Sequence, residues 1–207
     1  LIHLAAAVEK VGGWETPIRL NETTRAYFAK LATISAPERA SIYKALLDSK
    51  TAPDAQKFLR ERSPAEYSML RTSVVPTMLK AGIGANVIPS EAEATLDIRA
   101  APGEDLDEFF AGMAKVIADP AVKIERLPQS RPPSPASKLE TEMYRTMERV
   151  ATQIYPGATV LPSMSTGASD QAQLRAKGIQ SYGIGPGSTE SDEINYPAHG
   201  DVERLAE

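Results

Sequence analysis

The sequence contains no cysteine, only two histidines and one tryptophan among its 207 residues. The lack of cysteine excludes disulfide scaffolds, thiolate zinc sites and cysteine nucleophiles. No apolar run approaches the roughly 20 residues that cross a bilayer, so no membrane span is expected. Acidic residues outnumber basic ones by 27 to 23, which gives no basic footprint for nucleic acid. A hydrophobic content of 42% is instead sufficient for one large domain or two small ones.

Helical patterns dominate the first third of the chain. Apolar residues recur at helical spacing over residues 1–11, and two glycines end that run. The following stretch, residues 17–68, is polar and helical, and Pro37, Pro53 and Pro64 divide it into short helices. We interpret residues 17–68 as a helical insertion.

Strand signals begin after this stretch. Branched and apolar residues predict a strand over 72–79 and a second strand over 86–99, whose last part alternates apolar and polar residues. Acidic residues and an apolar stripe predict a helix over 104–116, and a third strand is predicted over 122–127. The order helix, strand, strand, helix, strand favours an α+β fold with a ferredoxin-like unit that lacks its first strand.

A proline-rich linker divides residues 1–128 from residues 129–207. In the second part, alternating patterns favour a portion of an α/β layer. Helices are expected over 139–154, 170–177 and 202–206, and strands over 159–161 and 179–184.

Two side chains are candidates for binding or polarising a substrate. The amide of Asn86 has the chemistry to donate to a carbonyl oxygen that becomes an oxyanion, although asparagine also suits a left-handed turn position. Arg99 has the chemistry to hold a carboxylate, although pairing with Asp97 or Glu93 is the simpler interpretation.

A histidine and a small-residue loop are further candidates. His199 stands on a loop beside Gly200, where its ring is able to face a metal ion. Zinc needs three or four donors, however, and an ordinary loop histidine is the alternative. The loop from Ser165 to Asp170 offers backbone amides to an anion, and Asp170 also suits a helix N-cap.

One pattern suggests a different chemistry. Ser41-x-x-Lys44 matches the spacing found in penicillin-recognising serine enzymes, but the K-T-G segment of those enzymes does not follow. A serine enzyme that uses Ser41 is therefore the weakest of the hypotheses.

Several blocks together resemble the co-catalytic zinc exopeptidases and deacylases of clan MH, which include aminoacylases, acetylornithine deacetylases, succinyl-diaminopimelate desuccinylases and glutamate carboxypeptidases. The blocks around Asn86 and Arg99 resemble the dimerisation (lid) domain of that family, and those around Gly167 and His199 resemble the end of its catalytic domain. The long stretch 17–68 is similar to the carboxypeptidase S branch. The blocks are Thr77-Met78-Leu79, Asn86-Val87-Ile88-Pro89, Leu96-Asp97-Ile98-Arg99, Ser165-Thr166-Gly167-Ala168-Ser169-Asp170, Tyr182-Gly183-Ile184-Gly185-Pro186 and His199-Gly200.

The resemblance implies a role for each candidate residue. His199 would be the C-terminal ligand of a site for two zinc ions, and Asn86 would stabilise the oxyanion, often in the partner subunit's site. Arg99, Gly167 and Ser169 would bind the substrate carboxylate. The implied reaction is hydrolysis of a peptide or N-acyl amide bond next to a free carboxylate, in a homodimer formed through the lid domain.

The other metal ligands of the family, and the Glu-Glu pair that carries its general base, do not occur in this sequence. In the family these segments precede the lid domain. We therefore expect the chain to be part of a longer enzyme and to be inactive by itself. A non-enzymatic α+β module that mediates dimerisation is the alternative.

Overall fold

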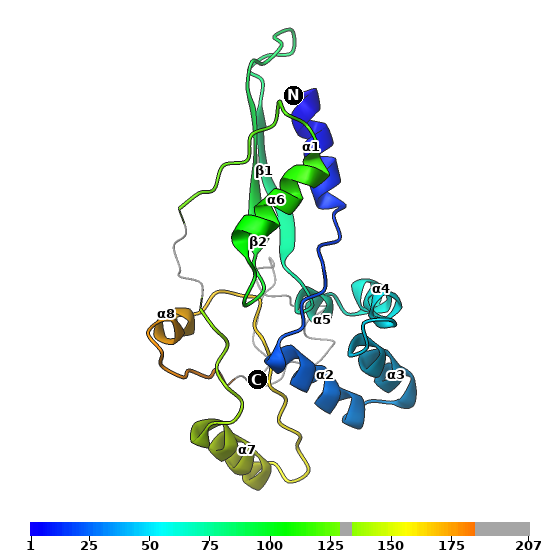
Figure 1. The fold of residues 1–207 in the computed structure, drawn as a ribbon, viewed down its shortest axis with the longest axis vertical. Coiled ribbons are helices and arrows are strands. Elements are labelled where there is room, and N and C mark those ends of the chain that lie inside the picture. Colours follow the sequence, from blue (N-terminus) through cyan, green and yellow to red (C-terminus); the bar gives the residue numbers. More distant parts are fainter. Residues whose placement is uncertain (129–133, 185–207) are drawn as a thin grey trace.

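The computed structural model describes residues 1–128 and 134–184 (Figure 1). Within these ranges no helix is long and apolar enough to cross a membrane. The helices are α1 (Ile2–Gly12), α2 (Glu22–Ile34), α3 (Pro37–Leu46), α4 (Ala52–Arg62), α5 (Pro64–Ser68), α6 (Leu106–Ile117), α7 (Glu142–Ile154) and α8 (Gln171–Ala176), and the strands are β1 (Ser73–Ala81) and β2 (Ala92–Arg99).

Helices α2 to α5 form a cluster whose boundaries follow from local sequence. Asn21 caps α2, because its side chain accepts from the Thr24 N–H while the Thr24 side chain accepts from the Asn21 N–H. Pro37, Pro53 and Pro64 each lie in the first two positions of a helix, where the missing N–H costs nothing. The predicted division of residues 17–68 into short helices is confirmed.

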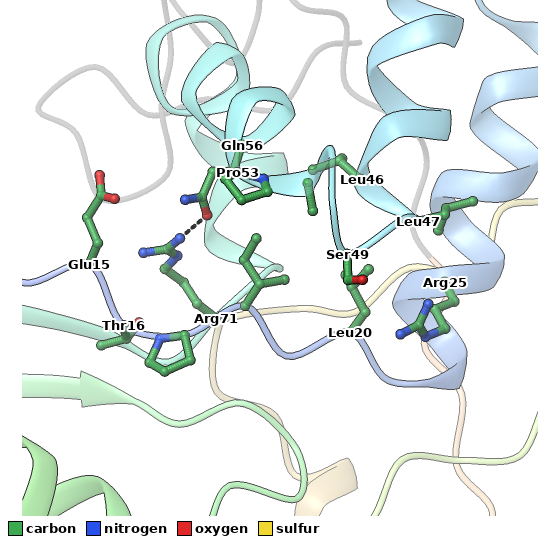
Figure 2. A pocket seen from close by; sticks show the side chains of 13 residues that line it. Glu15, Thr16, Leu20, Arg25, Leu46, Leu47, Ser49, Pro53, Gln56 and Arg71 are labelled. Atoms are coloured by element: carbon green, nitrogen blue, oxygen red, sulfur yellow. Dashed lines mark hydrogen bonds between the residues drawn. The ribbon is translucent and has the colours of Figure 1, made fainter.

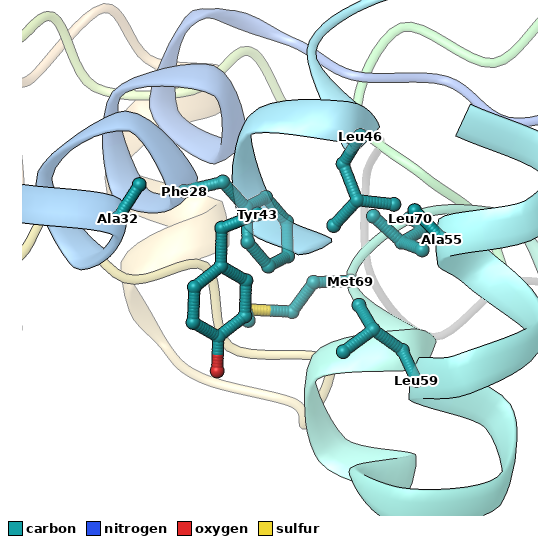
Figure 3. Packing of buried hydrophobic residues seen from close by; sticks show 8 residues of the cluster. All are labelled: Phe28, Ala32, Tyr43, Leu46, Ala55, Leu59, Met69 and Leu70. Carbon is teal, nitrogen blue, oxygen red and sulfur yellow. The ribbon is translucent and has the colours of Figure 1, made fainter. Parts of the chain in front are cut away.

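The cluster has its own hydrophobic core (Figure 3). The ring of Tyr43 packs against Phe28 in this core, with ring centroids 5.9 Å apart. The Tyr43 hydroxyl donates to the Glu66 carboxylate at 2.9 Å, and burial beside this carboxylate raises the pKa of Tyr43 well above its usual value. The buried members are Phe28, Ala32, Tyr43, Leu46, Ala55, Leu59, Met69 and Leu70.

A second core lies between the β1–β2 hairpin and two helices. Strands β1 and β2 pair antiparallel, from Ser73 opposite Arg99 to Ala81 opposite Ala92. Helices α1 and α6 lie against this hairpin (Figure 1), and their buried side chains pack with partly buried strand residues. The helical members are Ala7, Val11, Phe109, Met113 and Ile117, and the strand members are Val74, Leu96 and Ile98.

The ladder is irregular between Pro76 and Met78. Proline has no N–H to donate to a neighbouring strand, and within sheets it is confined to edges and bulges. The irregularity therefore lies where the sequence requires it.

Polar contacts hold α7 and the segment after it, up to Val160, against α2. The Lys30 ammonium donates to the Glu148 carboxylate at 2.5 Å and to the Val160 carbonyl at 3.1 Å. Met164 packs against the core of the helical cluster. Helix α7 and the segment after it are therefore fixed by the same residue of α2.

Several predicted strands are wrong. The second strand begins at Ala92 rather than at residue 86, because residues 82–91 form the hairpin loop. Residues 122–127, 159–161 and 179–184 form no strand. Val122 and Ile124 pack against the second core through their side chains. The apolar residues of this stretch are therefore partly buried without pairing as a strand. The helix predicted over 202–206 lies outside the described residues.

A buried polar network joins the hairpin core to the helical cluster. Its centre is Thr72, whose hydroxyl donates to the Glu104 carboxylate at 2.5 Å and accepts from the Ala101 N–H at 3.0 Å. Thr16 donates to the Thr72 carbonyl at 2.6 Å. Arg19 lies 2.8 Å from the other oxygen of Glu104, as an ion pair rather than an aligned hydrogen bond.

Replacing Thr72 with valine is expected to lower the free energy of unfolding by about 1–3 kcal/mol, because it leaves buried groups without their partner. Chemical denaturation measures this change. The control is Thr77→Val, on the exposed part of β1, for which we expect a change within about 0.5 kcal/mol. Equal effects of the two substitutions would contradict the role of the network.

Candidate functional site

Asn86 lies in the loop at the tip of the β1–β2 hairpin. The loop turns at Gly82, whose φ is +73°, and the Val87 N–H donates to the Gly84 carbonyl at 3.2 Å. Asn86 is exposed, and its amide makes no hydrogen bond with another described residue. Its φ is not positive, since Ala118 is the non-glycine residue with a positive φ in the described ranges. The left-handed turn position considered for Asn86 is therefore not adopted.

The tip of the hairpin is apolar as well as exposed. Ile83 and Ile88 flank Asn86, and each is 94% exposed. Met78 and Leu79, on the adjoining end of β1, are 63% and 68% exposed. An amide with free donors thus projects from a surface that water solvates poorly.

Arg99 lies at the opposite end of the same hairpin. Its Nε contacts the Asp97 carboxylate at 2.8 Å, and both side chains are about half exposed. This is the pairing considered as the simpler interpretation. An exposed pair of this kind contributes at most about 1 kcal/mol, so Asp97 holds the Arg99 guanidinium only weakly.

The hairpin separates Asn86 from Arg99 within one chain. Arg99 lies opposite Ser73, where the hairpin begins, whereas Ala92 follows the loop that carries Asn86. At about 3.3 Å per residue, Ala92 and Arg99 are roughly 23 Å apart. The structure therefore does not bring these two candidates together around one small substrate.

The loop before α8 holds the next two candidates. The Gly167 N–H donates to the Ser165 hydroxyl at 3.2 Å, and the Ser169 hydroxyl accepts from the Gln171 N–H at 3.2 Å. The side chain of Asp170 makes no capping hydrogen bond, so Ser169 supplies the contact that the sequence assigned to Asp170. Helix α8 lies below the hairpin, on the side away from its tip (Figure 1).

No zinc site is formed by the residues that the structure describes. In these ranges there is no group of three or more His, Cys, Asp or Glu side chains able to hold a metal ion. His199, the predicted ligand, lies outside them. His3 contacts the Asp119 carboxylate at 2.6 Å, and this contact lowers the pKa of Asp119.

Ser41, the candidate nucleophile of the weakest hypothesis, lies on the exposed surface of α3. Its hydroxyl donates to the Glu38 carbonyl at 2.6 Å, within its own helix. The hydroxyl is therefore engaged with backbone, as is common for serine in helices.

Comparison with known families identifies a domain to which part of the chain is similar. Residues 23–125 match the family model of the peptidase dimerisation domain of the M20 family. This range begins in α2 and ends after α6, so it contains both the helical cluster and the hairpin. These residues belong to the M20 peptidase dimerisation family.

Curated relatives of the chain carry related names. The probable carboxypeptidase S-like 2 of Dictyostelium discoideum is 30% identical over 107 residues, which are 52% of this chain and 21% of that protein. The N-fatty-acyl-amino acid synthase/hydrolase PM20D1 of Xenopus tropicalis is 28% identical over 147 residues, 70% of this chain and 28% of the relative. The human PM20D1 is 29% identical over 113 residues, 53% of this chain and 22% of the relative. The chain thus spans about a quarter of these proteins. No solved structure matches it.

A cavity beside the dimerisation domain's helical cluster was missed in the sequence. It has a volume of about 430 Å³ and is lined by Arg71, which directly precedes Thr72 (Figure 2). In the sequence, Arg71 is a charged residue next to a strand-forming run. This pattern is typical of an ordinary strand boundary, so it did not indicate a cavity.

Removing the Asn86 side chain is expected to leave the dimerisation domain as stable as before. Asn86 is exposed, and its amide makes no hydrogen bond with another described residue. Asn86→Ala should therefore change the free energy of unfolding by less than about 0.5 kcal/mol. Asn21→Ala, which removes the cap of α2, should cost about 1 kcal/mol in the same denaturation experiment. A comparable loss for Asn86→Ala would show that this residue is structural.

Proposed function

We propose that this chain is part of a zinc-dependent hydrolase that cleaves a peptide or N-acyl amide bond next to a free carboxylate. The main observation that supports this proposal is the match of residues 23–125 to the peptidase dimerisation domain. The names of the relatives, a carboxypeptidase and an N-fatty-acyl-amino acid synthase/hydrolase, support the same class of reaction. We propose that residues 1–128 form the lid domain, with residues 17–68 as its helical insertion, and that residues 129–207 are the C-terminal segment of the catalytic domain.

Asn86 is proposed to stabilise the oxyanion that forms when the amide carbonyl is attacked. Its side-chain nitrogen is a free donor on an exposed loop, and an oxyanion requires such a donor within hydrogen-bond distance. The apolar residues around it, Ile83 and Ile88, would exclude water and strengthen that hydrogen bond once they are covered.

Arg99 and the loop that holds Gly167 and Ser169 are proposed to bind the carboxylate of the substrate. A guanidinium binds a carboxylate through charge-assisted hydrogen bonds. The present partner of Arg99 is one exposed aspartate, which a substrate is able to replace.

The separation of these residues favours a site shared between two subunits. Since Asn86 lies roughly 23 Å or more from Arg99 along its own hairpin, we propose that Asn86 serves the active site of the partner subunit. In a homodimer formed through the lid domain, the exposed side chains of Met78, Leu79 and Ile88 would gain apolar contacts.

His199 is proposed as one ligand of a site for two zinc ions. This assignment rests on the resemblance around His199-Gly200, because the described residues form no metal site of their own. Further ligands and the general base would come from segments of the enzyme beyond this sequence. For this reason the 207-residue chain is proposed to be inactive alone.

Substitution of His199 in the complete enzyme tests the proposal. His199→Ala is expected to lower the zinc content and to abolish hydrolysis of N-acyl amino acids, because a ligand is lost. Metal analysis and a hydrolysis assay measure the two effects, and sedimentation should show an unchanged dimer.

His3→Ala is the matched control, since His3 contacts Asp119 on the surface and should not affect turnover. Unchanged hydrolysis by His199→Ala would overturn the metal assignment. Hydrolysis by the 207-residue chain with added zinc would overturn its proposed inactivity. A complete protein without any hydrolase activity would favour the non-enzymatic dimerisation module.

A further inference from the structure

The chain between α7 and the Ser165–Asp170 loop belongs to no helix or strand, and it passes the start of α2 on its way to α8 (Figure 1). Within the part of the chain that the structure describes, residues 159–164 form no backbone–backbone hydrogen bond. A stretch without such bonds keeps one position only where side chains hold it. The side chains that hold this stretch therefore determine where the loop begins.

Lys30 of α2 is the first of these side chains. Its ammonium donates to the Val160 carbonyl at 3.1 Å and to the Glu148 carboxylate of α7 at 2.5 Å, and it lies 5.9 Å from the centroid of the Tyr144 ring. Lys30 and Glu148 are 38% and 33% exposed, so solvent and salt screen their attraction less than that of a surface pair. Since an ammonium carries three donors, one side chain is able to fix both α7 and the segment after it.

A second anchor lies directly before the loop. Met164 packs against the core of the helical cluster, and the Asn21 amide donates to its sulfur at 3.7 Å. Pro162, between the two anchors, is buried, whereas residues 165–168 are exposed. At the far end of the loop, α8 buries none of its residues. The described contacts that fix the start of the loop thus come from α2 and the helical cluster.

We propose that Lys30 is a positioning residue for the Ser165–Asp170 loop. By fixing the chain before the loop, it would hold Gly167 and Ser169 where they meet the substrate carboxylate. The inference rests on the proposed function, in which this loop binds that carboxylate. Residues 17–68 would then contribute to substrate binding through Lys30, without a contact to the substrate itself.

A distance measurement on the 207-residue chain tests the positioning. Because the chain has no cysteine, Ala29→Cys on α2 and Thr166→Cys in the loop, both at exposed positions, each accept one nitroxide label. Pulsed electron paramagnetic resonance then measures the distance between the labels. We expect one narrow distance distribution with Lys30 present, and a distribution about twofold wider or more in Lys30→Met, because the restraint on Val160 is lost.

The matched control is Lys57→Met, which removes an exposed lysine of α4 and should leave the distribution narrow. If Lys30→Met does not fold, Lys30→Gln replaces it, since a shorter neutral side chain suits the same half-exposed position in a helix and should widen the distribution as well. An unchanged distribution in the folded variant would overturn the inference. A wide distribution in the chain that retains Lys30 would overturn it too.

The kinetic consequence is measured in the complete enzyme with N-dodecanoylglycine. Lys30→Met should raise KM about tenfold and change kcat less than about twofold, because carboxylate binding is weakened while the reacting groups stay in place. A role in stability alone would reduce the amount of active enzyme, and so lower the apparent kcat at unchanged KM. That result would overturn the inference.

Two further outcomes separate this inference from the proposed function. A widened distance distribution with unchanged KM and kcat would overturn the role of Gly167 and Ser169 in binding the substrate. Absence of hydrolysis by the unsubstituted enzyme would contradict the proposed hydrolase, and the distance measurement would still decide whether Lys30 positions the loop.

Discussion

The buried carboxylate of Glu104 is the constraint on which the arrangement of the two cores depends. Its side chain is 4% exposed, and it contacts Thr72 through one oxygen and Arg19 through the other. A carboxylate in such a place is tolerated only when its oxygens are paired. The three residues come from separate connections of the chain, so their pairing fixes the hairpin with α1 and α6 against the helical cluster.

The hairpin determines how the candidate site is distributed. One end is anchored beside the Glu104 network, and Arg99 lies there, whereas the other end projects beyond the helices and carries Asn86 among exposed apolar side chains (Figure 1). A rigid hairpin cannot fold Asn86 back onto Arg99. The proposed action of both residues on one substrate therefore requires the proposed homodimer, in which a two-fold axis would supply each site from both subunits.

Much of the fold was predictable from local patterns. Prolines at helix starts, the acids before α6 and the alternation around Leu96 and Ile98 each depend on a few neighbouring residues, and the structure confirms them. The strand predicted over 122–127 was wrong because an apolar pattern does not reveal whether a neighbouring strand is available for pairing. For the site, the sequence identified Asn86 and Arg99 as candidates but not the roughly 23 Å between them, which depends on where the hairpin turns. The cavity around Arg71 was not predictable, since it forms between segments distant in sequence.

The most direct test of a site shared between subunits is complementation between two inactive variants of the complete enzyme. Asn86→Ala and His199→Ala are each expected to be inactive as homodimers. If Asn86 acts in the partner's site, a mixed dimer contains one complete site, formed by His199 of one subunit and Asn86 of the other. Random exchange at equal amounts should then restore about one quarter of the wild-type activity. No recovery, with mixed dimers demonstrated by mass, would mean that Asn86 acts within its own subunit or not at all, and would contradict the account.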